Sequence, residues 1–99
     1  MKLEITATDE GYRLAGELDM ATADDLSDLL HGAVGREPPV VLDFEGISFM
    51  DSSGLRVLLE AARSENGGTT LVIVRPSDQV QRVLDISIPG GVPGLEVRA

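Results

Sequence analysis

Residues 40–62, with the sequence VVLDFEGISFMDSSGLRVLLEAA, contain the succession of elements that decides the fold. The segment opens with Val40 to Phe44, a short and nearly continuous apolar run. Such runs are typical of strands that are buried on both faces of a parallel sheet. After a short loop, apolar residues recur at the spacing of one helical face: Leu55, Leu58, Leu59 and Ala62. The segment therefore predicts a buried strand, a loop and an amphipathic helix.

Two alternating segments precede this unit. Apolar and polar residues alternate from Leu3 to Ala7 and again from Tyr12 to Leu18, with the turn-forming residues Asp9 to Gly11 between them. Alternation with a period of two is typical of half-buried strands, and a glycine-containing turn between two such runs indicates a hairpin. We therefore predict an antiparallel hairpin at the N-terminal end of the fold.

A helix is predicted between the hairpin and the central strand. Its apolar face would consist of residues at helical spacing: Leu26, Leu29, Leu30, Ala33 and Val34. Thr22, with Asp25 three residues later, resembles a capping box at the start of this helix. Gly35, followed by Pro38 and Pro39, predicts its end.

The C-terminal third repeats the alternation of strand and helix. Asn66 to Gly68 would end the helix that follows the central strand, and Thr70 to Val74 reads as another buried strand. Pro76 to Asp78 opens a helix whose inner face would carry Val80, Val83 and Leu84, and Leu95 to Arg98 is predicted as a last edge strand. The order β-β-α-β-α-β-α-β predicts a single α/β domain, residues 1–99, with a mixed, largely parallel sheet.

Composition and charge restrict the kind of partner. The 99 residues carry a formal net charge of −9, which disfavours nucleic acid and anionic membrane surfaces and suits a basic protein partner. Hydrophobic residues make up 42% of the chain, enough for one core, although aromatic residues are only 3%. The chain has no cysteine for a disulfide or a thiolate site. No segment has the length of a signal peptide or a membrane span, so we expect a cytoplasmic protein without direct membrane insertion.

Ligands of open parallel sheets gather outside the carboxyl ends of the strands. Three segments are predicted to lie there, namely Glu17 to Met20, Gly46 to Gly54 and Arg75 to Asp78. The middle segment contains Asp51-Ser52-Ser53-Gly54, which places two adjacent hydroxyls beside a carboxylate at the start of a helix. These residue types are also common as helix N-caps, so a purely structural role is the alternative.

The flanking sequence resembles the STAS family, named for sulphate transporters and anti-sigma-factor antagonists. The motif Phe49-Met50-Asp51-Ser52-Ser53-Gly54-Leu55 follows a buried strand and begins a helix, and Gly16-Glu17-Leu18-Asp19 ends the second strand. The resemblance covers nearly the whole chain. It implies that Ser53 is the site of phosphorylation, and that the contact surface is bordered by four residues: Asp19, Asp51, Ser52 and Gly54.

Met50 and Leu55 flank the serines in this motif. They are predicted either as the apolar part of the docking surface or as residues that belong to the core.

The resemblance also implies a function without catalysis. In stand-alone members, the unphosphorylated antagonist binds an anti-sigma factor, which is itself a serine kinase, and thereby frees the sigma factor. Phosphorylation at Ser53 would abolish that binding, and a metal-dependent serine phosphatase would reset it. The alternative within the family is an adaptor subunit of an ABC lipid-transport system or a scaffold of stress signalling.

Other chemistries are poorly supported by the residues. A hydrolase would need a base for its serine, and the only histidine, His31, falls late in the first helix, away from the strand ends. A phosphoaspartate receiver would need a nearby lysine with its carboxylates, but the only lysine is Lys2. The spacing of Asp24, Asp25 and Asp28 is that of a solvated helix face rather than a metal site. No cofactor is therefore expected.

Overall fold

The computed structural model describes residues 3–32, 39–63 and 70–98. In chain order, its elements are β1 (Glu4–Ala7), β2 (Gly11–Leu18), α1 (Ala23–Gly32), β3 (Val40–Met50), α2 (Ser52–Ala61), β4 (Leu71–Val74), α3 (Asp78–Ser87) and β5 (Leu95–Arg98). This order confirms the predicted succession of strands and helices.

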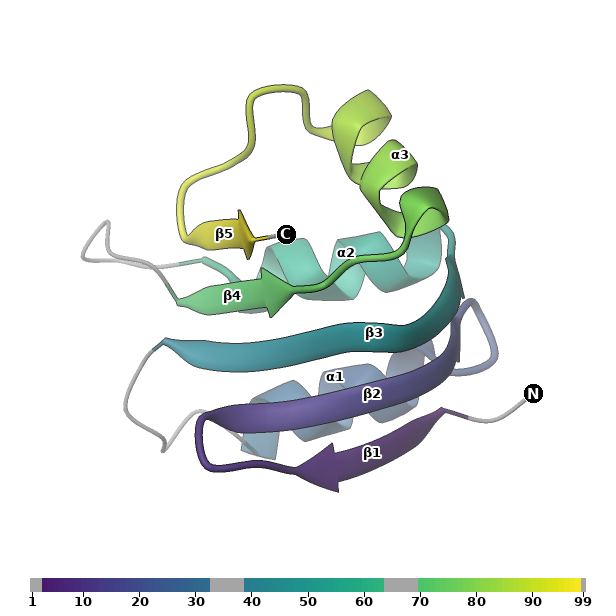
Figure 1. Cartoon of the computed structure of the whole chain (residues 1–99), viewed down its shortest axis with the longest axis vertical. Coiled ribbons are helices and arrows are strands. Elements are labelled where there is room, and N and C mark those ends of the chain that lie inside the picture. Colours follow the sequence, from purple (N-terminus) through teal and green to yellow (C-terminus); the bar gives the residue numbers. More distant parts are fainter. Residues whose placement is uncertain (1–2, 33–38, 64–69, 99) are drawn as a thin grey trace.

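The strands form one five-stranded sheet in the spatial order β1-β2-β3-β4-β5. β1 is antiparallel to β2, as the predicted hairpin requires, and the other three pairs are parallel. Figure 1 shows α1 and α2 behind the sheet and α3 beside the carboxyl end of β3. None of the helices among the described residues is long and apolar enough to cross a membrane.

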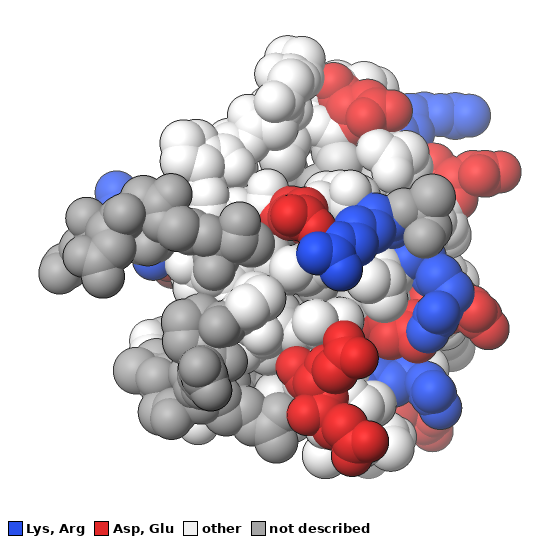
Figure 2. Space-filling view, turned by 60° about the vertical axis from the view of Figure 1, so that its left-hand side comes forward, with Lys and Arg blue, Asp and Glu red and all other residues white. Residues whose placement is uncertain are grey.

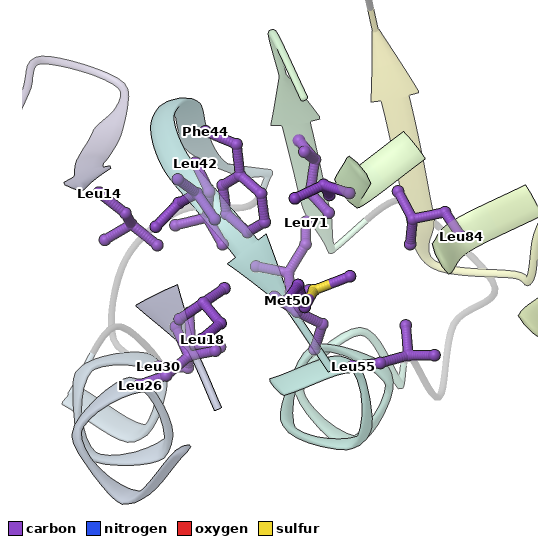
Figure 3. Packing of buried hydrophobic residues seen from close by; sticks show 14 of the residues in the cluster. Leu14, Leu18, Leu26, Leu30, Leu42, Phe44, Met50, Leu55, Leu71 and Leu84 are labelled. Atoms are coloured by element: carbon purple, nitrogen blue, oxygen red, sulfur yellow. The ribbon is translucent and has the colours of Figure 1, made fainter. Parts of the chain in front are cut away.

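The core lies between the sheet and the helices, and it includes Val80 and Leu84 of α3. Figure 3 shows Leu14 of β2 and Leu42 of β3 near the ring of Phe44, with Leu18 of β2 beside Leu26 and Leu30 of α1. Phe44, Leu14, Leu26 and Leu58 are among the side chains with no exposed surface. With so few aromatic residues, leucine supplies most of the buried area that stabilises the fold.

β3 is longer than the sequence predicts. The apolar run ends at Phe44, but the strand continues to Met50 because β2 accompanies it to the pair Leu18–Met50. Gly46 permits this close pairing, since a Cβ at that position would lie 2.8 Å from the Cβ of Ala15. The predicted loop between strand and helix is therefore wrong, and β3 leads almost directly into α2.

β1 also differs from its prediction as a half-buried strand. All four of its residues are exposed, and Ile5 keeps 38% of its surface accessible. β1 lies at the edge of the sheet, whereas Figure 1 shows α1 and α2 behind its middle. Alternation of apolar residues predicted the strand correctly, but it could not predict how far the helices cover it.

The start of α1 is built differently from a capping box. The carbonyl of Thr22 accepts the first helical hydrogen bond, from the N–H of Leu26. Its buried hydroxyl turns backward and donates to the carbonyl of Glu17 at 2.7 Å. The predicted helix residues Ala33 and Val34, the predicted helix end at Gly35, and the predicted stop at Asn66 to Gly68 lie outside the described residues.

Candidate functional site at the carboxyl ends of β2 and β3

Asp51 caps the N-terminus of α2. Its backbone is extended, with φ −114° and ψ −172°, and its Oδ1 accepts hydrogen bonds from the N–H of Ser53 at 2.8 Å and of Gly54 at 3.4 Å. A carboxylate in this position satisfies helix donors that would otherwise lack a partner and also suits the positive end of the helix dipole. The carboxylate beside the serines therefore has a structural role in this state.

The two serines occupy the first turn of α2. Ser52 is exposed and Ser53 is partly exposed. Among the described residues, no group forms a hydrogen bond with the Ser53 hydroxyl, and none of their buried side-chain oxygens or nitrogens lacks a partner. The Ser53 oxygen is therefore in contact with solvent and not enclosed in the core.

Asp19 lies at the end of the neighbouring strand. Leu18 and Met50 pair across β2 and β3, and the N–H of Asp51 donates to the carbonyl of Leu18 at 3.0 Å. The Oδ1 of Asp19 accepts from the N–H groups of Ala21 and Thr22, at 2.9 and 3.1 Å. The sheet thus brings two carboxylates to adjacent strand ends, each of them capping the backbone that follows it.

Three of the predicted contact residues belong to the interior. Met50 has no exposed surface and Leu55 only 6%, so both are core residues (Figure 3). Gly54 is also buried, and a Cβ there would lie 2.8 Å from the Cβ of Leu18. The prediction of Met50 and Leu55 as apolar docking residues is corrected accordingly. Gly54 lets α2 approach the end of β2.

Two other apolar side chains are exposed near the strand ends. Met20, directly after Asp19, exposes 81% of its surface, and Phe49, at the end of β3, exposes 38%. Sequence reasoning missed both. A methionine in a turn of acidic residues is a usable signal for Met20, but the exposure of Phe49 depends on the extension of β3.

Gln79 of α3 also reaches this end of the sheet. Its Oε1 accepts from the N–H of Met50 at 2.8 Å, and its Nε2 donates to the carbonyl of Met50 at 3.0 Å. The partners are 29 residues apart in the chain, so no local pattern could have predicted the contact.

Arg75, the first residue after β4, does not lie at the strand ends that carry Ser53. Val74 pairs with Asp43, so Arg75 lies midway along β3, where its guanidinium contacts Asp43 and, at 3.2 Å, Glu45. Burial of the Asp43 carboxyl would raise its pKa. The hydrogen bonds from Arg75 and the Glu45 N–H, with the charges of Arg75 and Arg13, outweigh that effect and hold the pKa below its usual value. Figure 2 shows that basic side chains (blue) and acidic side chains (red) lie next to one another on this face of the molecule.

The histidine and the aspartates that the sequence analysis considered for hydrolase and metal chemistry lie on α1. The Nδ1 of His31 lies 2.8 Å from the carbonyl of Ser27, within its own helix. That helix end is opposite the strand ends that carry Ser53 (Figure 1). Asp24, Asp25 and Asp28 are exposed on α1, and the described part of the chain holds no group of three or more metal-binding side chains.

Comparisons with known proteins agree with this arrangement. The anti-sigma F factor antagonist of Paenibacillus polymyxa is 36% identical over 78 residues, which are 76% of this chain and 67% of that protein. Among solved structures, a Thermotoga maritima protein matches with a TM-score of 0.72 at 19% identity, over 98% of this chain and 86% of its own. The anti-sigma factor antagonist SpoIIAA in its unphosphorylated form matches with a TM-score of 0.64 at 24% identity, over 94% and 86% of the two chains.

The family model of the STAS domain matches residues 2–88, which include every described helix and all strands but β5. The hairpin, the parallel β2-β3 pair and the serines on the first turn of α2 all fall within that match. This chain belongs to the STAS domain family.

Proposed function

We propose that this protein is an anti-sigma-factor antagonist whose binding is switched off by phosphorylation of Ser53. In the unphosphorylated state it binds an anti-sigma factor with serine kinase activity and frees the sigma factor. It acts in the cytoplasm as a binding protein, not as an enzyme, and a metal-dependent serine phosphatase restores it. The similarity to the Paenibacillus polymyxa antagonist supports the partner class, and the solvent contact of the Ser53 hydroxyl supports the switch.

The accessible hydroxyl is the observation that carries this proposal. A kinase can reach Ser53 without unfolding the protein, because the serine lies on the first turn of α2 and is partly exposed. The carboxylates of Asp19 and Asp51 and the hydroxyl of Ser52 border it at the strand ends. Exposed Met20 adds an apolar contact to this docking face.

A phosphate at Ser53 would act by charge and bulk. It adds about −1.5 to −2 charges at neutral pH. Because Asp51 already accepts from the N–H groups of Ser53 and Gly54, those donors are not free to neutralise the new anion. At about 6 Å and an effective dielectric near 20, each pair of like unit charges costs about 3 kcal/mol before salt screening. One such pair weakens a complex by roughly a hundredfold.

The test is phosphorylation followed by a binding measurement. Candidate anti-sigma kinases and ATP are incubated with the wild type, and mass spectrometry locates phosphate on the peptide from Ser48 to Arg56. Ser53→Ala should accept no phosphate and bind the kinase permanently, whereas Ser53→Asp should bind weakly. Ser52→Ala is the matched control, since it removes the neighbouring hydroxyl and should behave as the wild type.

Two results would overturn the proposal. If Ser53→Ala is phosphorylated as well as the wild type, the acceptor is Ser52. A pull-down that returns an ABC ATPase in place of a kinase assigns the chain to the adaptor class. The switch is also proposed to be local, so the near-ultraviolet and amide spectra of the phosphorylated form should keep the pattern of an intact core.

A further inference from the structure

β3 loses its strand neighbour on one side long before it ends. β4 pairs with β3 only from Val40 to Asp43, because it ends at Val74. The remainder of β3, up to Met50, has β2 on one side and no described strand on the other. Main-chain groups that point toward this open side need other partners.

Gln79 supplies those partners at the last residue of the strand. Its primary amide presents an acceptor oxygen and an N–H donor in the same plane, and these meet the N–H and the C=O of Met50 at 2.8 and 3.0 Å. This pattern reproduces what a residue of a neighbouring strand would offer. The side chain of a helix thus completes the sheet where β4 has already turned away.

The contact lies directly before the phosphoacceptor turn, which we define as Asp51 to Ser53. Met50 is held from one side by Gln79, and the next N–H, that of Asp51, donates to Leu18 on the other side at 3.0 Å. Asp51 then caps α2 and orients Ser53 through its N–H. The position of the Ser53 hydroxyl therefore depends on a short chain of hydrogen bonds that begins on α3.

The segment that leads from β4 into α3 contacts β3 at a second point. Arg75, in a left-handed conformation with φ 53°, contacts Asp43, and Ser77 caps the helix by accepting from the N–H of Val80 at 3.3 Å. Gln79 follows two residues later. The chain that enters α3 is thus tied to β3, and the two hydrogen bonds to Met50 orient the Gln79 amide.

From these contacts we propose that Gln79 is a positioning residue, which fixes the phosphoacceptor turn to α3 and sets the orientation in which Ser53 meets its kinase. The second half of this inference rests on the proposed function. The first half, the attachment of Met50 to α3, does not, and the two are tested separately.

Amide hydrogen exchange tests the attachment. In Gln79→Ala, exchange at the Met50 amide should accelerate about tenfold, the factor expected for the loss of one buried hydrogen bond, while that of Asp51 stays nearly unchanged. Gln81→Ala is the matched control on the same helix, since the Gln81 side chain donates its hydrogen bond to exposed Asp85, at 2.9 Å. Equal acceleration at Met50 and Asp51, or no difference between the two variants, would overturn the attachment.

Gln79→Glu adds a readout that a general loss of stability would not produce. The ionised carboxylate can accept from the Met50 N–H but cannot donate to its carbonyl, whereas the protonated form can do both. The Met50 amide resonance of the variant should therefore titrate near the ordinary glutamate pKa of about 4.3, over and above any pH dependence of this resonance in the wild type. If the variant and the wild type titrate alike, the carboxylate does not meet Met50 and the proposal fails.

Kinetics with the cognate kinase test the second half. Gln79→Ala should lower kcat for phosphorylation of Ser53 about tenfold and leave KM nearly unchanged, because the docking face is intact and only orientation is lost. Gln81→Ala should change neither constant. An unchanged kcat in Gln79→Ala would overturn the positioning role. A wild type that accepts no phosphate would overturn the proposed function, while the exchange experiment still decides whether Gln79 holds Met50.

Discussion

β3 has two halves that differ in what surrounds them. From Val40 to Phe44 the strand is apolar and, as far as Asp43, lies between β2 and β4. From Gly46 to Met50 it has a strand on one side only, its pairing with β2 contains register shifts, and a helix side chain completes its last residue. The first half stabilises the fold, and the second brings Ser53 to the surface. The two halves of β3 thus have different roles, one in the stability of the fold and one in the exposure of Ser53.

The two phenylalanines of the protein test this division most directly, because one lies in each half. Phe44 has no exposed surface, so Phe44→Ala should lower the free energy of unfolding by about 3–5 kcal/mol. Phe49 exposes 38% of its surface, and Phe49→Ala should cost less than about 1 kcal/mol. Urea denaturation of both variants gives the comparison, and equal losses would contradict the division.

Gly54 sharpens the comparison where the second half meets α2. Alanine normally favours a helix over glycine, but a Cβ at position 54 would lie 2.8 Å from the Cβ of Leu18. Gly54→Ala should therefore lower the free energy of unfolding by about 1–3 kcal/mol. Gly32→Ala on α1 is the control, since its Cβ would meet nothing within 4 Å and should leave stability equal or higher. Thermal denaturation in which both substitutions behave alike would rule out close packing as the cause.

Asp43 tests what holds the first half where β4 ends. Asp43→Asn removes the charge that faces Arg75 and should cost about 1–2 kcal/mol near neutral pH. The folded pKa of this group is lowered, so its contribution is complete above the unfolded value of about 3.9 and is lost as pH falls through the folded pKa. The difference in unfolding free energy between wild type and variant should be constant from neutral pH to about pH 5 and shrink below about pH 4. If the difference in unfolding free energy persists below about pH 4, the charge of Asp43 is not what stabilises the fold.

A smaller effect than at Asp43 is expected at the turn after the second half. Asp51→Ala removes the side chain that accepts from the N–H groups of Ser53 and Gly54, and should cost about 1 kcal/mol. Asp51→Asn keeps an acceptor and should lose only part of that. Denaturation measures the loss of stability in both variants, and amide exchange in the first turn of α2 measures the loss of the cap. If the exchange rate of the Ser53 amide is the same in Asp51→Ala as in the wild type, Asp51 does not cap α2.

The first half of β3 could be predicted from sequence and the second could not, for a physical reason. Apart from Asp43, the residues from Val40 to Phe44 are apolar because the strand is enclosed there. Their residue types therefore predict a buried strand. Glu45 to Phe49 mixes polar residues with a glycine and an exposed phenylalanine, which is also the composition of a loop. Only the partner strand β2 makes this segment a strand.

The candidate site divides in the same way. Asp51, Ser52 and Ser53 were predicted at a helix start because N-caps leave a local signature, and the cap geometry is as expected. The burial of Met50 and Leu55 and the contact of Gln79 depend on how distant elements pack. For Met50 and Gln79, spacing along the chain gives no information about the partner, whereas the helical spacing of Leu55 with Leu58 and Ala62 already favours a core position.

The shortness of the two outer strands has a consequence for how the molecule behaves among other proteins. β1 and β5 each have four residues, and Glu4, Glu96 and Arg98 place charge on them, whereas the eleven-residue β3 is enclosed in the middle. An outer strand of this kind offers few backbone groups to a passing chain and repels many that approach. Fibril-like growth by strand addition at these two edges is thereby discouraged.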